Sequence, residues 1–497
     1  MERVEDLLRH QVETRPEYPA FSDSTGLAWT YADLDRASLD LMARLEGAGV
    51  QTGDRVLILS ENCCPKVAAL FACYRMGAVA VPVNARQTRS EIERIQRHAT
   101  PAAVLLTTSV SPDAQSHAEW FQAREISGRF GQMHLAETGV SDPDAPEEVA
   151  VLLYTTGTTG DPKGVMLTHG NLRFGGRTSA ELRGMTPKDV IYGVLPTTHV
   201  FGLASVITAA VHVGAPVRLE ARFTAAKLYE ALRSGVTLLS AVPQMHALLM
   251  QYTKEQGFDR LQSDTLRYVS SGAAPLDPDW KARAEAFYGV AVQNGYGMTE
   301  TTAGICATSY SIGVPDVSVG PPLPGVEVRL DEDVPGGGDG LGEVLARGAN
   351  VMLGYYRNPD ETAKVLEPEG WMRTGDMGRF DDQGLLHIEG RSKELIIHGG
   401  FNVFPPEVEA ALNAHPQVVQ AAVIGRRMKG DEEVLAFVQV ADGDVPDAEE
   451  LRAFVAGQLA GYKRPSHIVM AADLPAAPTG KILKHKLLEH FAERLDG

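Results

Sequence analysis

The first 110 residues alternate apolar, strand-like runs with helix-like runs, and this alternation restricts the fold more than any other feature. We expect strands at 27–31, 54–60, 78–83 and 102–107, and helices at 31–49, 65–77 and 90–98. The pattern resumes with helices at 227–234 and 243–252 and strands at 237–242 and 267–270. Strands that alternate with helices form largely parallel sheets covered by helices. The sequence therefore predicts an α/β fold.

Two changes in the pattern of expected helices and strands divide the rest of the chain. From about residue 314 to 390, short strands and many glycines predict a small antiparallel barrel or sheet. After residue 390, helices at 407–414 and 448–459 and strands at 418–424 and 434–440 predict an α+β unit, long enough for its own core. We expect a large N-terminal domain, 1–390, and a small C-terminal domain, 391–497.

Composition excludes several classes of protein. The net charge of −18 argues against a nucleic-acid or anionic-membrane partner. Four cysteines without a C-x-x-C pair disfavour a disulfide framework or a zinc site and fit the cytoplasm. The stretch 190–217 lacks charged residues, but the polar run 196–199 interrupts it. A strand, a loop and a buried helix explain that stretch better than a membrane span.

One loop has the chemistry of a phosphate-binding site. The apolar run 149–154 reads as a buried strand and leads into Tyr-Thr-Thr-Gly-Thr-Thr-Gly-Asp-Pro-Lys, which ends at Lys163. Hydroxyl and N–H groups of such a loop donate to phosphate oxygens, glycine permits close approach, and lysine adds positive charge. No Gly-Lys-Ser/Thr follows, so the loop is not a Walker A motif.

The segment 154–169 resembles the phosphate loop of the acyl-adenylate-forming superfamily: acyl-CoA synthetases, peptide-synthetase adenylation domains and firefly-type luciferases. The segments 270–275, 294–300, 370–376, 390–394, 399–407 and 478–482 resemble further motifs of this superfamily, in its order. The resemblance covers roughly residues 5–490. It implies ATP and Mg²⁺, an acyl-AMP intermediate, CoA as second substrate, and a mobile C-terminal domain.

The resemblance also assigns the nucleotide site. Its implied residues are Thr155, Thr156, Gly157, Thr158, Thr159, Lys163, Gly272, Ala273, Ala274, Asn294, Gly295, Tyr296, Gly297, Thr299, Asp376 and Arg391. Tyr296 would pack near the adenine, and Asp376 would accept both ribose hydroxyls, since a carboxylate accepts two hydrogen bonds at once. Glu300 would hold Mg²⁺, which prefers carboxylate and phosphate oxygens.

Three segments would serve the moving domain. Lys481, in Pro-Thr-Gly-Lys, would be the catalytic lysine that binds the acyl carboxylate and the α-phosphate and stabilises the transition state by its charge. Lys393 would be the hinge between the domains. Gly399, Gly400 and Phe401 would line the tunnel for the pantetheine arm of CoA.

The predicted acyl pocket is apolar. Its candidates are His199, Phe201, Gly202, Met245, Gly295, Met298, Ala303 and Gly304. None is basic, and burying an unpaired second carboxylate is costly, so dicarboxylates are disfavoured. The segment 196–205 has no acidic residue to hold an amine, so amino acids are disfavoured too. His199 would act at the acyl site; the alternative is a packed histidine that caps a helix at 201–213.

We therefore expect an ATP-dependent acid–CoA ligase for an aryl or medium-chain aliphatic monocarboxylic acid, with Lys481, His199 and Glu300 as catalytic residues. The alternative is a freestanding enzyme that loads an acyl carrier protein. A non-catalytic acyl-nucleotide sensor is disfavoured because Lys481, Glu300 and Asp376 are all present. The expected partners are the acid, ATP and CoA, with a homodimer as the candidate assembly.

Overall fold

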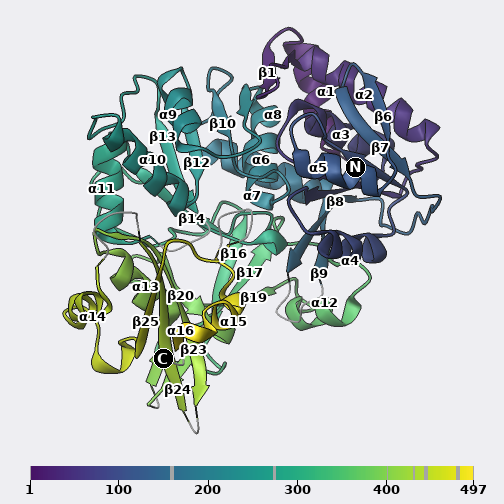
Figure 1. Cartoon of the computed structure of the whole chain (residues 1–497). Coiled ribbons are helices and arrows are strands. Elements are labelled where there is room, and N and C mark those ends of the chain that lie inside the picture. Colours follow the sequence, from purple (N-terminus) through teal and green to yellow (C-terminus); the bar gives the residue numbers. More distant parts are fainter. Residues whose placement is uncertain are drawn as a thin grey trace.

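The computed structural model describes residues 2–156, 162–272, 276–399, 401–428, 431–440, 446–476 and 482–495. Seven predicted site residues lie outside these ranges: Gly157, Thr158, Thr159, Ala273, Ala274, Gly400 and Lys481. The side chain of Thr156 also lies outside the description. Figure 1 shows two sheet-and-helix units side by side, with the green antiparallel strands and the yellow-green C-terminal part below them.

The first large sheet has the order β18-β9-β8-β4-β3-β5-β7-β6. Its parallel centre consists of β3 (Arg55–Ser60), β4 (Val79–Asn84), β5 (Ala103–Leu106) and β8 (Val149–Thr156). Antiparallel strands flank it: β6 (Arg124–Gly128), β7 (Gly131–Glu137), β9 (Pro162–Thr168) and β18 (Gly354–Tyr355). The predicted strands 54–60, 78–83, 102–107 and 149–154 are confirmed.

The second large sheet has the order β15-β14-β13-β12-β10-β11-β1-β2. Its strands are β1 (Pro19–Ser22), β2 (Ala28–Thr30), β10 (Ile191–Gly193), β11 (Val217–Leu219), β12 (Leu238–Ala241), β13 (Tyr268–Gly272), β14 (Val292–Tyr296) and β15 (Cys306–Ala307). The predicted strand 27–31 is β2. It lies at the edge of this second sheet, antiparallel to β1, whereas the strands predicted next along the chain form the first sheet. The cause is the pairing of β1 with β11, almost 200 residues away, which no local pattern reveals.

Five layers result, because each sheet is apolar on both faces. The helices between the sheets are α1 (Glu5–Thr14), α2 (Tyr31–Gly47), α3 (Cys64–Met76), α6 (His169–Leu182) and α8 (Ala209–Val213). Outside the first sheet lie α4 (Arg89–Ala99) and α5 (Pro112–Trp120). Outside the second lie α9 (Ala225–Arg233), α10 (Pro243–Glu255) and α11 (Pro278–Tyr288). Helices on both faces of mainly parallel sheets confirm the predicted class.

The charge-free stretch forms a buried helix in three pieces: α7 (Val200–Gly202), the π-helical η1 (Leu203–Thr208) and α8. The Thr208 hydroxyl donates to the carbonyl of Leu203 at 3.0 Å, within the wider π-turn. Insertions of this kind occur frequently at functional sites. Within the described residues, no helix combines the length and the apolarity that a membrane crossing requires.

A four-stranded antiparallel sheet follows, in the order β16-β17-β19-β20. Its strands are β16 (Val326–Asp331), β17 (Gly342–Gly348), β19 (Met372–Phe380) and β20 (Leu386–Arg391). Of the two expected forms, barrel or sheet, the described strands form an open sheet with β16 and β20 at its edges. Between β17 and β19, the chain returns to the first large sheet through β18 and α12 (Pro359–Val365).

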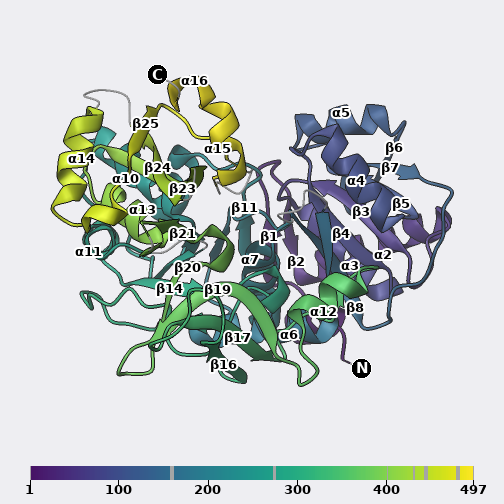
Figure 2. The ribbon, with the colours of Figure 1, turned by 90° about the horizontal axis from the view of Figure 1, so that it is seen from below.

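The C-terminal part has a core of its own. Its elements are β21 (Ile396–His398), β22 (Phe401–Val403), α13 (Pro405–Asn413), β23 (Val418–Met428), β24 (Asp431–Val440), α14 (Ala448–Ala456), β25 (His467–Ala471), α15 (Lys484–His490) and α16 (Ala492–Leu495). Its two apolar clusters contain no residue before Ile396. Figure 2 shows this part beside the N-terminal half of the chain. The division at residue 390 stays a prediction, which the separate core supports.

Candidate active site

A continuous cleft of about 2270 Å³ runs between the second large sheet, the antiparallel sheet and the C-terminal part. The ends of β13 and β14, the start of the 200–213 helix, and β19 and β20 line it from the N-terminal side. Residues of α13 and β23 and the segment 482–488 line it from the C-terminal side. The cleft brings together segments that are up to about 400 residues apart, and several of the predicted motif segments are among them.

The predicted phosphate loop connects two antiparallel strands, β8 and β9, in register Thr155 to Lys163. The ammonium group of Lys163 forms an ion pair with Glu361 on α12 and lies 5.0 Å from the centroid of the Tyr355 ring. The hydrogen bond from Lys163 lowers the pKa of Glu361 to about 2. Lys163 therefore lines the cleft but already has an anionic partner there.

Asp376 joins three elements at the middle of the cleft. It lies on β19, opposite Arg391 of β20, and its Oδ1 is 3.0 Å from the Arg391 Nε. The Tyr296 hydroxyl, at the end of β14, donates to its Oδ2 at 2.7 Å. Burial and the negative charge of Asp376 raise the pKa of Tyr296, and the same charge raises the pKa of Arg391. The structure thus brings three predicted nucleotide residues into direct contact.

Glu300 lies next to this group, in the short helix η2 (Thr299–Thr301). Its carboxylate is buried and accepts a hydrogen bond from the Tyr355 hydroxyl, Oη to Oε1, at 2.8 Å. Burial, with the charge of Glu300, raises the pKa of Tyr355. Tyr355 was not predicted, because no motif surrounds it. A carboxylate oxygen held in this way suits Mg²⁺.

The turn that presents Glu300 is tight. A Cβ on Gly297 would lie 2.3 Å from the carbonyl oxygen of Ala303, so only glycine fits there. Thr302 and Ala303 have φ angles of +50° and +74°, a left-handed conformation that is unusual for residues other than glycine. Backbone strain of this kind clusters at functional sites. Gly295, Asn294, Met298, Thr299 and Gly304 line the cleft around this turn.

At the acyl end, His199 begins the 200–213 helix. Its Nδ1 accepts the backbone N–H of Phe201 at 3.3 Å, so it caps the helix, yet its side chain is exposed in the cleft. The structure therefore confirms the helix cap of the alternative interpretation, but the histidine side chain is exposed rather than buried. The Phe201 ring lies against Gly272, where a Cβ would come within 3.1 Å of it.

A buried asparagine fixes the loop before His199. Asn62 Nδ2 donates to the carbonyls of Gly193 and Leu195, at 3.0 and 2.8 Å. Its Oδ1 accepts from the backbone N–H and the hydroxyl of Thr197, both at 2.9 Å. These four bonds connect the end of β3 in one sheet to the loop after β10 in the other. No motif in the sequence pointed to this role of Asn62.

Two features of the acyl end differ from the prediction. Met245 does not line the cleft: its side chain is buried in the apolar cluster beneath α10, because the face of α10 turned to the cleft carries Gln244 and Ala247 instead. Conversely, Arg183, which follows α6, does line the cleft. The acyl-pocket residues predicted from the sequence include no arginine or lysine, but they omit Arg183.

On the C-terminal side, Lys393 lies in the short helix η3 (Ser392–Glu394) and lines the cleft. The Lys484 ammonium lies 2.8 Å from carboxylate oxygens of both Glu394 and Glu409. The predicted tunnel residue Phe401 is 55% exposed and stacks on Tyr462 with the centroids 4.5 Å apart. Lys481 lies outside the described residues, but the segment that follows it lines the cleft.

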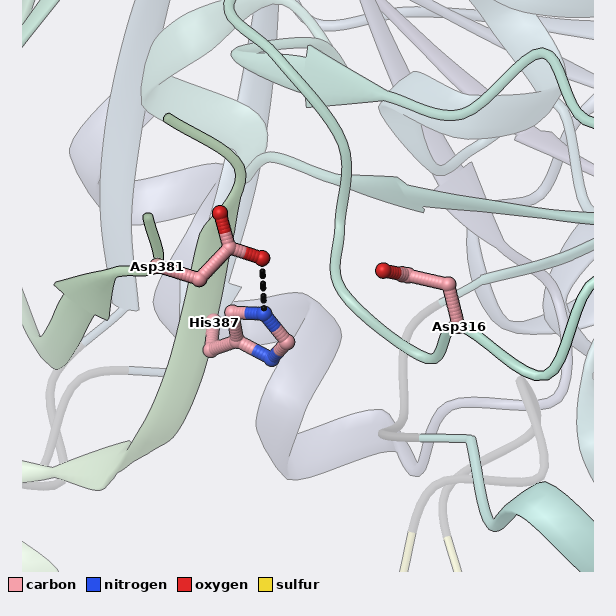
Figure 3. Close-up of side chains that lie close together, drawn as sticks. All are labelled: Asp316, Asp381 and His387. Carbon is pink, nitrogen blue, oxygen red and sulfur yellow. Dashed lines mark hydrogen bonds and ion pairs between the residues drawn. The ribbon is translucent and has the colours of Figure 1, made fainter. Parts of the chain in front are cut away.

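A further group of potential metal ligands is Asp316, Asp381 and His387 (Figure 3). Asp381 already accepts backbone N–H groups of Gln383 and Leu385, both at 2.9 Å, and lies 3.1 Å from the His387 Nε2. These bonds build the turn between β19 and β20. We therefore interpret the group as a turn network and leave Glu300 as the predicted Mg²⁺ ligand.

The sequence matches the AMP-binding enzyme family over residues 8–356 and the AMP-binding enzyme C-terminal domain over residues 407–481. The chain therefore belongs to the AMP-binding enzyme family. It is 35% identical to a feruloyl-CoA synthase of Amycolatopsis sp, over 94% of each chain. It is 32% identical to 4-coumarate–CoA ligase 1 of Oryza sativa subsp. japonica, over 98% of this chain and 93% of that one.

Solved structures agree with this assignment. ATP-bound MatB from Rhodopseudomonas palustris is 30% identical and superposes with a TM-score of 0.83, over 99% of this chain and 100% of that one. MenE, the O-succinylbenzoate coenzyme A synthetase of Bacillus subtilis, in complex with ATP and a magnesium ion, is 28% identical with a TM-score of 0.81, over 97% and 98%. The predicted family and fold class are thereby confirmed.

Proposed function

We propose that this chain, an AMP-forming acyl-CoA synthetase of the AMP-binding enzyme family, activates a carboxylic acid with an aryl or medium-chain aliphatic body. The single observation that carries the proposal is the cleft itself. The Tyr296–Asp376–Arg391 cluster, Glu300 and the His199–Phe201–Gly272 wall all line it, and the two groups adjoin where Gly272 of β13 pairs with Gly295 of β14. The curated relatives named as feruloyl-CoA and 4-coumarate–CoA enzymes support an aryl acid.

In the first half-reaction, the acid's carboxylate oxygen attacks the α-phosphate of ATP, and pyrophosphate leaves. Asp376 would hold the ribose hydroxyls, and Glu300, oriented by Tyr355, would be the protein's ligand for Mg²⁺, which would neutralise phosphate charge. Lys163 and Lys481 provide positive charge on the phosphates. Because the ammonium group of Lys163 has Glu361 as its partner, binding of ATP must compete with that ion pair.

In the second half-reaction, CoA sulfur attacks the acyl carbonyl and AMP leaves. The exposed Phe401, the hinge at Lys393 and the separate core of the C-terminal part support a rotation that brings residues 399–401 to the cleft. Hinges of this kind absorb the change in a few backbone dihedrals. Lys393→Pro should therefore slow thioester formation while acyl-AMP still forms. Single-turnover assays of each step measure this.

The acceptor decides between CoA and a carrier protein. We propose CoA, a cytoplasmic location and a homodimer; the acyl carrier protein is the second candidate acceptor. The test incubates enzyme, ATP and Mg²⁺ with a panel of benzoate, cinnamate, hexanoate, octanoate, malonate and phenylalanine. AMP and thioester are quantified with CoA or with a phosphopantetheinylated carrier protein. Thioester on the carrier protein alone, or malonate or phenylalanine as the best acid, would contradict the proposal.

A further inference from the structure

The region of the cleft beyond Phe201, lined by α6, η1 and β13, carries several polar side chains beside the apolar Leu182. The side chains that line it come from the end of α6, from η1 and from β13: Thr178, Ser179, Arg183, Ser205, Tyr268 and Ser270. The Ser179 hydroxyl donates to that of Ser205, and the Ser270 hydroxyl to that of Ser240, both at 3.0 Å. An acyl pocket for a purely apolar tail would not need these groups.

This region continues the wall that Phe201 and Gly272 form in the predicted acyl pocket. Ser205 lies four residues after Phe201, about one turn further along the same helix. Tyr268 lies four residues before Gly272 on the same face of β13, about 13 Å back along the strand. The two walls that meet at Phe201 and Gly272 therefore continue inward to Ser205 and Tyr268.

Arg183 closes the channel at this depth. Its Nη1 donates to the carbonyl of Ser205 at 2.6 Å, and its Cζ lies 5.7 Å from the centroid of the Tyr268 ring. The side chain is only 7% exposed. The guanidinium thus bridges the helix wall and the strand wall at the inner end of the cleft.

The charge of Arg183 lacks a counter-charge in the described part of the chain. No carboxylate of the described residues forms an ion pair with it, and its Nε is buried without a hydrogen-bond acceptor among them. The nearby Asp189 is held by Arg267, with Nε 2.7 Å from Oδ1. A buried charge is costly unless it is paired, and a guanidinium offers a fork of N–H donors to an oxygen acceptor.

We propose that Arg183 binds an oxygen acceptor at the far end of the acid, a phenolic oxygen or a second carboxylate carried on a rigid body. The proposal rests on the proposed function and narrows its substrate class to aryl acids with a polar group opposite the reacting carboxyl. Short dicarboxylates remain excluded, now by reach: malonate cannot extend across a channel of about 13 Å from Gly272 to Tyr268.

The test compares acids of one shape that differ only at the far end: cinnamate, 4-methylcinnamate, 4-hydroxycinnamate and 4-carboxycinnamate. Acid-dependent pyrophosphate release gives kcat/KM for each. In the unmodified enzyme, the hydroxyl or the carboxyl acid should exceed the methyl acid by roughly 10- to 100-fold, as expected for a hydrogen bond to a charged group. If 4-hydroxycinnamate is the better substrate, the bound acceptor is neutral. If 4-carboxycinnamate is better, the bound acceptor is anionic. Octanoate and octanedioate form a second, aliphatic pair.

Arg183→Met removes the charge and keeps most of the volume. It should lose that 10- to 100-fold preference and leave kcat/KM for the methyl acid within about threefold of the unmodified enzyme. Arg183→Lys should keep part of the preference. Arg177→Met, at an exposed arginine on α6, is the matched control and should leave every ratio unchanged.

Three outcomes overturn the inference. The first is equal kcat/KM of the unmodified enzyme for the polar and the methyl acids, which decides the matter even if Arg183→Met does not fold. The second is an equal loss of kcat/KM for all acids in Arg183→Met, which is the result of a purely structural arginine. The third is a preference of the unmodified enzyme for cinnamate or 4-methylcinnamate over both polar acids. Failure of every acid to release pyrophosphate would instead contradict the proposed function.

Discussion

The two ends of the cleft use different chemistry. At the nucleotide end, each of three carboxylates has a partner: Asp376 holds Tyr296 and Arg391, Glu300 holds Tyr355, and Glu361 holds Lys163. At the acyl end, a ring against a glycine, several hydroxyls and one buried guanidinium form the wall. Paired charges organise the nucleotide end, whereas the acyl end combines shape with one buried guanidinium. Variants at the nucleotide end should therefore change the dependence on ATP or Mg²⁺, whereas variants at the acyl end should change the choice of acid.

The largest effect is expected from Asp376→Ala. It removes the acceptor of the ribose hydroxyls, and hydrogen bonds to charged groups are each worth about 1.5–3 kcal/mol. We expect kcat/KM for ATP to fall by roughly 100-fold or more, with the ranking of acids unchanged. Pyrophosphate release at varied ATP measures this, and Asp382→Ala, at an exposed aspartate of the next turn, is the control. An unchanged dependence on ATP would show that Asp376 has another role.

Tyr355→Phe should have the next largest effect. It removes the hydrogen bond that orients Glu300 but leaves the carboxylate in place. Loss of such an orienting partner typically weakens metal binding by about 10- to 100-fold. Titration of activity with Mg²⁺ should show a half-saturation concentration raised by about tenfold, and excess Mg²⁺ should restore the rate. A loss of rate that Mg²⁺ does not restore would argue against a metal role for Glu300.

The sequence predicted the nucleotide end more completely than the acyl end. Tyr296, Glu300, Asp376 and Arg391 belong to motifs, and the structure brings them together. The strands of the parallel centre were predicted to within about two residues, because buried apolar runs are local signals. Arg183 was not predicted, because an arginine just after a helix normally lies in solvent near the helix dipole. The edge position of β2 was missed, because strand pairing is not local.

Gly304→Leu should sharpen the comparison from the acyl side. A Cβ at this position would lie 2.6 Å from Leu323 Cδ1, so a larger side chain must take space from Leu323 or from the cleft. Each methylene group excluded from the pocket costs about 0.8 kcal/mol, or about fourfold in kcat/KM. Activity on the largest accepted acids should fall while acetate and the KM for ATP stay unchanged. A raised KM for ATP with no change in acid preference would mean that Gly304 belongs to the nucleotide end.

Glu361→Gln should have the smallest effect, and it should lower the KM for ATP. It frees Lys163 from its ion pair, so the ammonium group becomes available to phosphate. Because the cleft leaves both side chains partly open to solvent, the ion pair is weak, and the KM for ATP should fall by only about two- to fivefold. Lys163→Met should raise the KM for ATP. Adding Glu361→Gln to Lys163→Met should not lower the KM for ATP again. A higher KM in Glu361→Gln alone would show that Glu361 supports the bound nucleotide.

The central claim is that one cleft joins an acid to AMP before CoA takes part. The most direct measurement is the exchange of labelled pyrophosphate into ATP without CoA. It is made with the unmodified enzyme, with a variant of the nucleotide end and with a variant of the acyl end. We predict exchange that depends on the preferred acid, that Asp376→Ala lowers for every acid, and that Gly304→Leu lowers only for the larger ones. Exchange that requires CoA, or that proceeds equally well without any acid, would contradict the account.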